Sequence, residues 1–210
     1  MIGIMADSHG QTDTICNALA VFEELGCGSI YHLGDVCDSA HPETANACVK
    51  ILQDRQVQTL KGNNDQVIVA NHSGRENSPV SREVLGTLRN LELAKYHPKA
   101  MFIHSLPFIQ ELGLSSLIGT MGPMEISRFC REFPGQILFR GHSHTPEIAW
   151  LEGQSVVAES LPAGVRYSLA DKIPCVVTCG ALTRGLGMIW NPADNCIKSL
   201  RITERFFDNR

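Results

Sequence analysis

The sequence contains no long apolar run, no basic stretch and no leader-like start, and these absences narrow the class of protein. No segment approaches the roughly 20 consecutive apolar residues of a membrane-spanning helix, so we expect no membrane association. The opening MIGIMADSHG lacks the basic start and long apolar segment of a signal peptide, which favours a cytoplasmic protein. The net charge of -4 without a basic stretch argues against an extended nucleic-acid-binding surface.

Two familiar catalytic signatures are also missing. The sequence has no Gly-x4-Gly-Lys-Ser/Thr pattern, so phosphate binding of the Walker type is excluded. It has no Gly-x-Ser-x-Gly pattern either, so a serine hydrolase of that type is not expected.

Cysteines, by contrast, are plentiful: there are 8, and no two of them are spaced as CxxC. A structural zinc site made of cysteines needs closer pairs than these. Without a secretory signal, we expect reduced thiols in the interior. Cys37 lies inside a motif described below and is interpreted as a small buried filler.

The 210 residues suffice for one domain, which we expect to span residues 1–210. In the first half, short apolar runs alternate with helical patterns. We expect strands over 1–6 and 29–35, a strand ending in a polar loop over 57–65, and helices over 12–25 and 42–54. Right-handed crossovers between such strands give a parallel sheet.

Strands dominate the second half. We expect helices over 78–91 and 125–133 and strands over 100–105, 136–144, 147–152, 155–160, 174–180, 187–192 and 197–203. Asp194 and Asn195 suit a hairpin turn between the last two strands. The predicted class is α/β, a four-layer α/β/β/α sandwich of two mixed sheets with flanking helices. The apolar, glycine-rich segment 105–123 has three open interpretations: a lid beside the site, a partner surface, or an irregular buried excursion.

Polar side chains follow most of the expected strands at the point where each strand ends. They are Asp7, His9, Asp35, Asn63, His104, His142 and His144. The carboxyl ends of parallel strands meet at one edge of a sheet, where sites form, so we expect these side chains in one site.

The residue types at this edge indicate metal chemistry. Carboxylate, amide oxygen and imidazole together suit Mn²⁺, Fe or Zn²⁺. Seven side chains are too many for one tetrahedral ion, but they suit two ions if one carboxylate bridges them. Two carboxylates and two divalent ions leave the filled site positive, so it would attract a phosphate. Two such ions can activate a water and stabilise displacement at phosphorus.

The motifs Asp-x-His, Gly-Asp-x-x-Asp, Gly-Asn-x-Asp, a lone His and Gly-His-x-His follow one another between residues 7 and 144. In this order they resemble the calcineurin-like metallophosphoesterase superfamily, especially its small bacterial and archaeal phosphodiesterases. The resemblance implies a first ion held by Asp7, His9, Asp35 and His144. It implies a second ion held by Asp35, Asn63, His104 and His142, with Asp35 bridging. It favours Mn²⁺, with Fe, Ni or Zn²⁺ as alternatives.

The same resemblance suggests roles beyond the ligands. Asn63, Asn64 and His104 are expected to fix the oxygens of the reacting phosphoester. Asp38 is expected to orient a ligand or the substrate; its alternative is a solvated loop carboxylate. Many relatives carry a histidine where this sequence has Asn64, and asparagine cannot deliver a proton at neutral pH. We therefore expect a preference for good leaving groups.

Several other polar residues have less definite interpretations. Arg184 either reaches a phosphate oxygen or lies on the surface, and Arg140 precedes the histidine pair but is expected to point away. We interpret the histidines outside the motifs as structural or exposed; they are His32, His41, His72 and His97.

The leading hypothesis is a dinuclear metal-dependent phosphoesterase, preferentially a phosphodiesterase, acting on a phosphoester small molecule or a nucleotide. One alternative is a hydrolase of dinucleoside polyphosphates, which shares the chemistry. Another is a non-catalytic protein-binding scaffold, as in the retromer subunit similar to this family. The intact ligand set argues against the scaffold. Loops 66–80 and 105–123 are expected to decide the substrate, and the oligomeric state, including a dimer, is left open.

Overall fold

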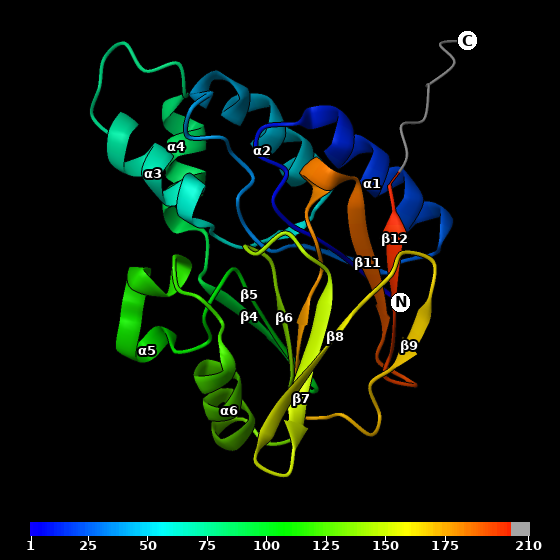
Figure 1. Cartoon of the computed structure of the whole chain (residues 1–210). Helices are drawn as coiled ribbons and strands as arrows, with labels where there is room; N and C mark the ends of the chain where they lie inside the picture. Colours follow the sequence, from blue (N-terminus) through cyan, green and yellow to red (C-terminus); the bar gives the residue numbers. More distant parts are fainter. Residues whose placement is uncertain (203–210) are drawn as a thin grey trace.

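Two six-stranded mixed sheets lie face to face in the computed structural model, with helices outside them (Figure 1). The structure describes residues 1–202. Residues 203–210 of the expected domain, including the end of the strand expected at 197–203, lie outside the described part. The predicted α/β class, with two mixed sheets and flanking helices, is confirmed.

The first sheet has the strand order β3-β2-β1-β11-β12-β9. Its strands are β3 (Gln58–Thr59), β2 (Ser29–His32), β1 (Ile2–Met5), β11 (Leu186–Asn191), β12 (Cys196–Arg201) and β9 (Arg166–Ser168). As expected, β1, β2 and β3 are parallel. The other three strands run antiparallel to their neighbours, and Asn195 takes a positive φ of 51° in the predicted turn between β11 and β12.

The second sheet has the order β4-β5-β6-β10-β7-β8. Its strands are β4 (Ala94–His97), β5 (Ala100–Ile103), β6 (Ile137–Arg140), β10 (Cys175–Thr178), β7 (Glu147–Glu152) and β8 (Ser155–Ser160). Here β5, β6 and β10 form the parallel part. Each sheet therefore contains three parallel strands whose carboxyl ends can supply a site.

The helices lie on the outer faces of the sheets (Figure 1). They are α1 (Thr12–Glu24), α2 (Ala45–Asp54), α3 (Asn63–His72), α4 (Arg82–Asn90), α5 (Ile109–Leu112) and α6 (Pro123–Glu132). Short 3₁₀ turns cover Pro42–Thr44, Gly113–Leu117 and Leu182–Arg184.

Three apolar clusters hold the layers together. Phe22 belongs to the cluster between α1 to α4 and the first sheet. Phe102 and Trp190 fill the space between the two sheets, with ring centroids 6.2 Å apart. Phe129 of α6 packs with Leu138 on the outer face of the second sheet. Because side chains of a strand alternate between faces, strands covered on both faces read as continuous apolar runs in the sequence.

The expectation for the third strand and its loop was wrong. Strand β3 has only two residues, and the segment expected as a loop after residue 62 begins a helix, α3, at Asn63. The sequence NNDQVIVANH hides this helix, since it starts with two asparagines and continues with β-branched residues, which have low helix propensity. The Asp65 carboxylate accepts from the Gly62 N–H at the helix start, and Ile68 and Val69 are buried, so tertiary contacts override propensity.

Other boundaries also differ from the expected ones. Helix α4 begins at Arg82, not at residue 78, because the Ser81 hydroxyl caps it by accepting from Val84 N–H at 3.2 Å. Strands β4 and β9 were not expected; they are short edge strands with polar sequences. In segment 105–123, Phe108 and Leu117 are buried, whereas Leu114 and Ile118 are exposed. The segment is therefore a partly buried excursion containing α5 and a 3₁₀ turn.

Candidate metal centre

The expected strand-end residues converge where the parallel strands of both sheets end. The first sheet supplies Asp7, His9, Asp35 and Asn63, and the second supplies His104, His142 and His144. The sheets are joined here directly. The His142 N–H donates to the Asp7 carboxylate at 3.0 Å, and His104 Nδ1 lies 2.8 Å from the Leu33 carbonyl oxygen.

The backbone carrying these side chains is strained. The φ angles are positive at Asp7 (56°), His9 (43°), Asp35 (54°), His142 (68°) and His144 (61°). Non-glycine residues adopt this left-handed conformation at an energetic cost, and such residues cluster at functional sites. These positive φ angles direct the five side chains toward the candidate metal centre.

One group of donors lies around Asp7. His144 Nε2 is 3.6 Å from Asp7 Oδ1 and 3.4 Å from His9 Nε2. His9 Nε2 is also 3.8 Å from Asp35 Oδ2. Ligand atoms of Asp7, His9 and His144 all lie within 4.8 Å of one another, which suits one bound cation.

A second group lies around His104. Because the Leu33 carbonyl can only accept, a neutral His104 carries its proton on Nδ1 and directs the lone pair of Nε2 into the site. That Nε2 lies 3.0 Å from Asn63 Oδ1 and 3.2 Å from His142 Nδ1. Asn63 Oδ1 is in turn 3.1 Å from His142 Nδ1. Two of these atoms, His104 Nε2 and Asn63 Oδ1, have no proton to share, so this arrangement suits a cation between them.

Asp35 lies between the two groups. Its Oδ1 is 3.6 Å from His104 Nε2, and its other oxygen faces His9. The backbone N–H of Asn64 donates to Oδ1 and the Asn64 side-chain amide donates to Oδ2, both at 2.8 Å. A carboxylate offers about four lone-pair positions. With two of them occupied by Asn64, about two remain, which suits a carboxylate that bridges two ions.

The surroundings shift the pKa values of the candidate ligands in different directions. Burial acts to raise the pKa of Asp7, but His144, His104 and His9 outweigh burial and the pKa lies below its usual value. Contact with Asp7 raises the pKa of His144. Burial and the neighbouring His104 and Arg140 lower the pKa of His142, which favours its neutral, ligating form.

Asp65 is a buried residue that the sequence interpretation missed. Its carboxylate accepts from the backbone N–H groups of Gly62 (2.8 Å), Cys37 (2.9 Å) and Val36 (3.4 Å). Burial, and then the nearby Asp35 charge, raise the pKa of Asp65. The residue joins the loop after β2 to the start of α3. It is the last residue of Gly-Asn-x-Asp, so the motif contained the signal, but two of its three partners, Val36 and Cys37, come from another segment.

The contact of a buried histidine, His32, was also not predicted from the sequence. His32 Nε2 lies 2.9 Å from the Ser8 hydroxyl, between the first two candidate ligands of the chain. Burial lowers the pKa of His32 to about 3, so this histidine is neutral. His32 is therefore a structural residue that stabilises the loop carrying Asp7 and His9.

The remaining expected residues lie in different places. The Asp38 carboxylate accepts from the Ala40 N–H at 2.8 Å, and within residues 1–202 it is not part of the groups of candidate metal ligands. Arg184 is exposed, and its Nη1 is 3.5 Å from the Thr145 hydroxyl. His72 ends α3, contrary to its expected place in a loop. Cys37 is buried, as expected for a filler, and burial raises the pKa of its thiol.

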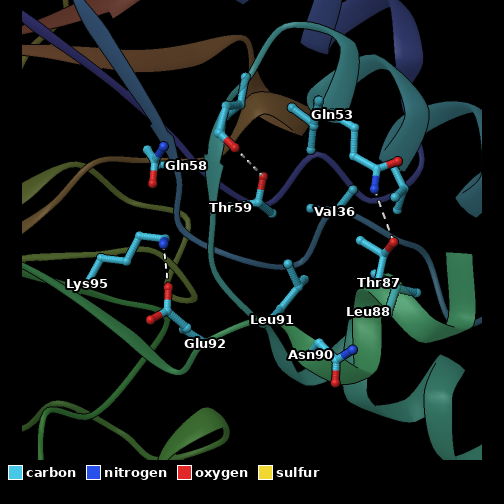
Figure 2. Close-up of a pocket in the computed structure, with 13 residues that line it drawn as sticks. Val36, Gln53, Gln58, Thr59, Thr87, Leu88, Asn90, Leu91, Glu92 and Lys95 are labelled. Atoms are coloured by element: carbon cyan, nitrogen blue, oxygen red, sulfur yellow. Dashed lines mark hydrogen bonds and ion pairs between the residues drawn. The ribbon is translucent and has the colours of Figure 1, made fainter.

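One hollow lies apart from the candidate ligands. A crevice of about 270 Å³ lies between α2, β3 and α4 and includes Val36 in its lining (Figure 2). Its polar rim groups are paired with one another. Gln53 donates to the Thr87 hydroxyl at 3.1 Å, and Lys95 pairs with Glu92. Among residues 1–202, no helix is long and apolar enough to cross a membrane.

Comparison with known proteins places the chain in a family. Residues 1–160 match the sequence model of the calcineurin-like phosphoesterase superfamily domain. Comparison with curated proteins gave no match.

Solved structures show the same fold. A metallophosphoesterase from Sphaerobacter thermophilus is 18% identical with a TM-score of 0.78, over 97% of this chain and 88% of that one. A hypothetical protein from Pyrococcus horikoshii OT3 is 13% identical with a TM-score of 0.68, over 98% of this chain and 89% of that one. The family match covers most of the chain, and it includes every candidate ligand. The chain belongs to the calcineurin-like phosphoesterase superfamily.

Proposed function

We propose that the chain is a phosphodiesterase that depends on two divalent metal ions. The observation that carries the proposal is the convergence of electron-pair donors with no proton between them, above all His104 Nε2 and Asn63 Oδ1 at 3.0 Å. Such a contact is unfavourable until a cation lies between the atoms. Family membership supports phosphoester hydrolysis as the reaction type.

The donor set fits two ions. Asp7, His9, Asp35 and His144 would hold one, and Asp35, Asn63, His104 and His142 the other, with Asp35 shared. When bound, such ions would activate a water and stabilise the negative charge that develops on the oxygens around phosphorus. Oxygen and imidazole ligands favour Mn²⁺, although Fe, Ni and Zn²⁺ accept the same donors.

The chain's own residues orient this set. Asn64 fixes both oxygens of Asp35, and the Leu33 carbonyl fixes the tautomer of His104. Such supporting contacts typically change metal affinity or activity about 10- to 100-fold when removed. Because the Asn64 position offers no titratable proton, the proposed enzyme acts best on esters with good leaving groups.

The alternatives differ from this proposal in specific ways. A hydrolase of dinucleoside polyphosphates would use the same centre and differ in the groups around it. A protein-binding scaffold would need neither the strained ligands nor the buried residues that support them.

None of the eight cysteines forms a disulfide, which supports a reducing compartment such as the cytoplasm.

The test is an assay of the Mn²⁺-loaded protein on bis-p-nitrophenyl phosphate beside p-nitrophenyl phosphate. We expect diester hydrolysis that stops on addition of a chelator. Asp35→Asn should lower kcat about 100-fold or more and reduce the bound metal, since it removes the shared ligand. The exposed Asp54→Asn on α2 is the matched control and should change neither quantity.

Each outcome is informative. Two metal equivalents per chain with diester turnover would support the proposal. Two equivalents with no turnover on either ester would favour the scaffold. If Asp35→Asn keeps both its turnover and its full metal content, Asp35 does not bridge the two ions.

A further inference from the structure

A hollow of about 380 Å³ adjoins the candidate centre on the side of His142. Thr120 and Met121 of segment 105–123 line it, together with Arg140, Ser143 and Glu147. His142 is part of the same lining, so a molecule held at the centre can extend into this hollow.

Arg140 lies at the floor of the hollow. Its Nε donates to the Ser105 carbonyl oxygen at 3.0 Å, and its Nη1 donates to the hydroxyls of Ser143 (3.0 Å) and Thr178 (3.4 Å). Arg140 therefore contacts the residues that directly follow His104 and His142 in the chain. These contacts brace both loops, but they are made to neutral groups only.

The charge of Arg140 has no matching carboxylate. The side chain is only 4% exposed, and no carboxylate in residues 1–202 lies within ion-pair distance of its guanidinium. A guanidinium keeps its proton in proteins, so Arg140 is charged. Buried charges in proteins are normally paired, and an unpaired one beside a cleft indicates a binding role.

Metal loading makes this imbalance larger. The Asp7 charge is the first of those that favour the charged form of Arg140. Once Asp7 ligates a cation, that negative charge is neutralised and the centre becomes positive. The guanidinium then needs an anion from outside the chain.

We propose that the hollow is a subsite for an anionic group, a carboxylate or a phosphate, on one of the two esterified moieties of the substrate, and that Arg140 binds this group. This inference rests on the proposed phosphodiesterase function and narrows its substrate class to diesters that carry a second negative charge. A guanidinium presents its donors in a fork that matches such oxyanions.

The geometry limits where that charge can lie. Arg140 and His142 are two residues apart, so their Cα atoms lie at most about 7 Å from each other, and we expect the second charge near the reacting phosphorus. Thr178 pairs with Arg140 on β6 and with Glu147 on β7, so the three residues form a row on one face. Glu147 stands two strands from Arg140, about 10 Å away, and repels an anion bound further along the row.

The test compares two symmetrical diesters, bis(4-carboxyphenyl) phosphate and its dimethyl ester, bis(4-methoxycarbonylphenyl) phosphate. Because each diester is symmetrical, its orientation in the site does not matter. The methyl ester has the better leaving group and is intrinsically more reactive, so a preference for the carboxylate cannot come from intrinsic reactivity. We expect kcat/KM of the loaded wild type to favour the carboxylate. Arg140→Gln should lower the carboxylate-to-ester ratio about 10- to 100-fold, mainly through KM, as expected for one charge-assisted hydrogen-bonded pair.

Further variants separate binding from bracing. Arg140→Lys keeps the charge without the fork and should retain part of the ratio. The exposed Arg201→Gln on β12 should leave it unchanged. Glu147→Gln should raise the ratio, roughly threefold at low salt, and it answers the question if Arg140→Gln does not fold.

Two results would each mean that Arg140 only supports the two loops, and would overturn the subsite. In the first, Arg140→Gln lowers kcat/KM equally for both diesters; in the second, Glu147→Gln leaves the carboxylate-to-ester ratio unchanged. If the loaded wild type hydrolyses neither diester, the proposed function fails separately. Titration of the same protein with both intact diesters then decides the subsite: tighter binding of the carboxylate keeps it, and equal binding removes it.

Discussion

At the residue scale, the motif side chains were predictable and their supports were not. The motifs revealed the seven candidate ligands because strand ends bring Asp, Asn and His to one edge. Asp65 has two partners, Val36 and Cys37, and His32 has one, Ser8, that lie 24 to 29 residues away in the chain, so no local pattern shows them. Arg140 was expected to point away, and only the packing of segment 105–123 over β6 reveals that it is buried beside the site.

Asn64 leads to a residue-scale prediction about leaving groups. Asn64→His places a titratable group where many relatives have one, and general acid catalysis contributes about 10²- to 10⁴-fold. We expect kcat/KM of the wild type to fall steeply across aryl methyl phosphodiesters as the leaving-group pKa rises, and to fall less steeply in Asn64→His. Asn64→Ala is the control. It loses the Asp35 contact without adding an acid, and should be slower with the steep dependence retained. Equal wild-type rates for phenolic and alkyl leaving groups would contradict the assignment.

At the scale of elements, pieces with a clear apolar pattern were predictable, whereas the polar edge strands and the helix held by tertiary contacts were not. Helices α1 and α6 and strands β7 and β8 lie within two residues of their expected bounds. Helix α3 was missed because its stability comes from Asp65 and from packing, which local propensity does not report.

Two glycines give an element-scale prediction. A Cβ on Gly62, which directly precedes α3, would collide with the Asp35 backbone nitrogen, whereas Gly86 inside α4 has open space around it. We expect Gly62→Ala to destabilise the metal-free protein by about 3 kcal/mol, roughly 6–12 °C in Tm. Gly86→Ala should instead stabilise it by about 0.5–1 kcal/mol through helix propensity. Thermal unfolding in the presence of a chelator, followed by circular dichroism, measures both changes in Tm. Changes of the same sign would contradict the crowded surroundings of Gly62 and the open space around Gly86.

At the scale of the whole molecule, the family match and the folded unit have different limits. The match ends at residue 160, yet β10 and β11 follow it and lie in the middle of the sheets. Strand β10 lies between β6 and β7, and β11 connects β1 to β12. The two-sheet class could be predicted from the many strands of the second half, but the insertion of late strands between early ones could not.

Truncation tests this interlocked order. A chain ending at residue 160 keeps every candidate ligand but loses a central strand from each sheet, which leaves the β7–β8 hairpin without its link to β6. We expect no cooperative thermal or urea transition for residues 1–160, in contrast to the full chain. A cooperative transition of the truncated chain would show that its sheets close without β10 and β11.

The late position of β11 also has a consequence for synthesis. β1 leaves the ribosome long before its antiparallel partner β11, because most of the described chain lies between the two strands. Until then the nascent chain carries open strand edges on β1 and β6, and edges of this kind attract other chains. Pairings between such distant segments form slowly, so these edges stay open to wrong partners until β10 and β11 have been made.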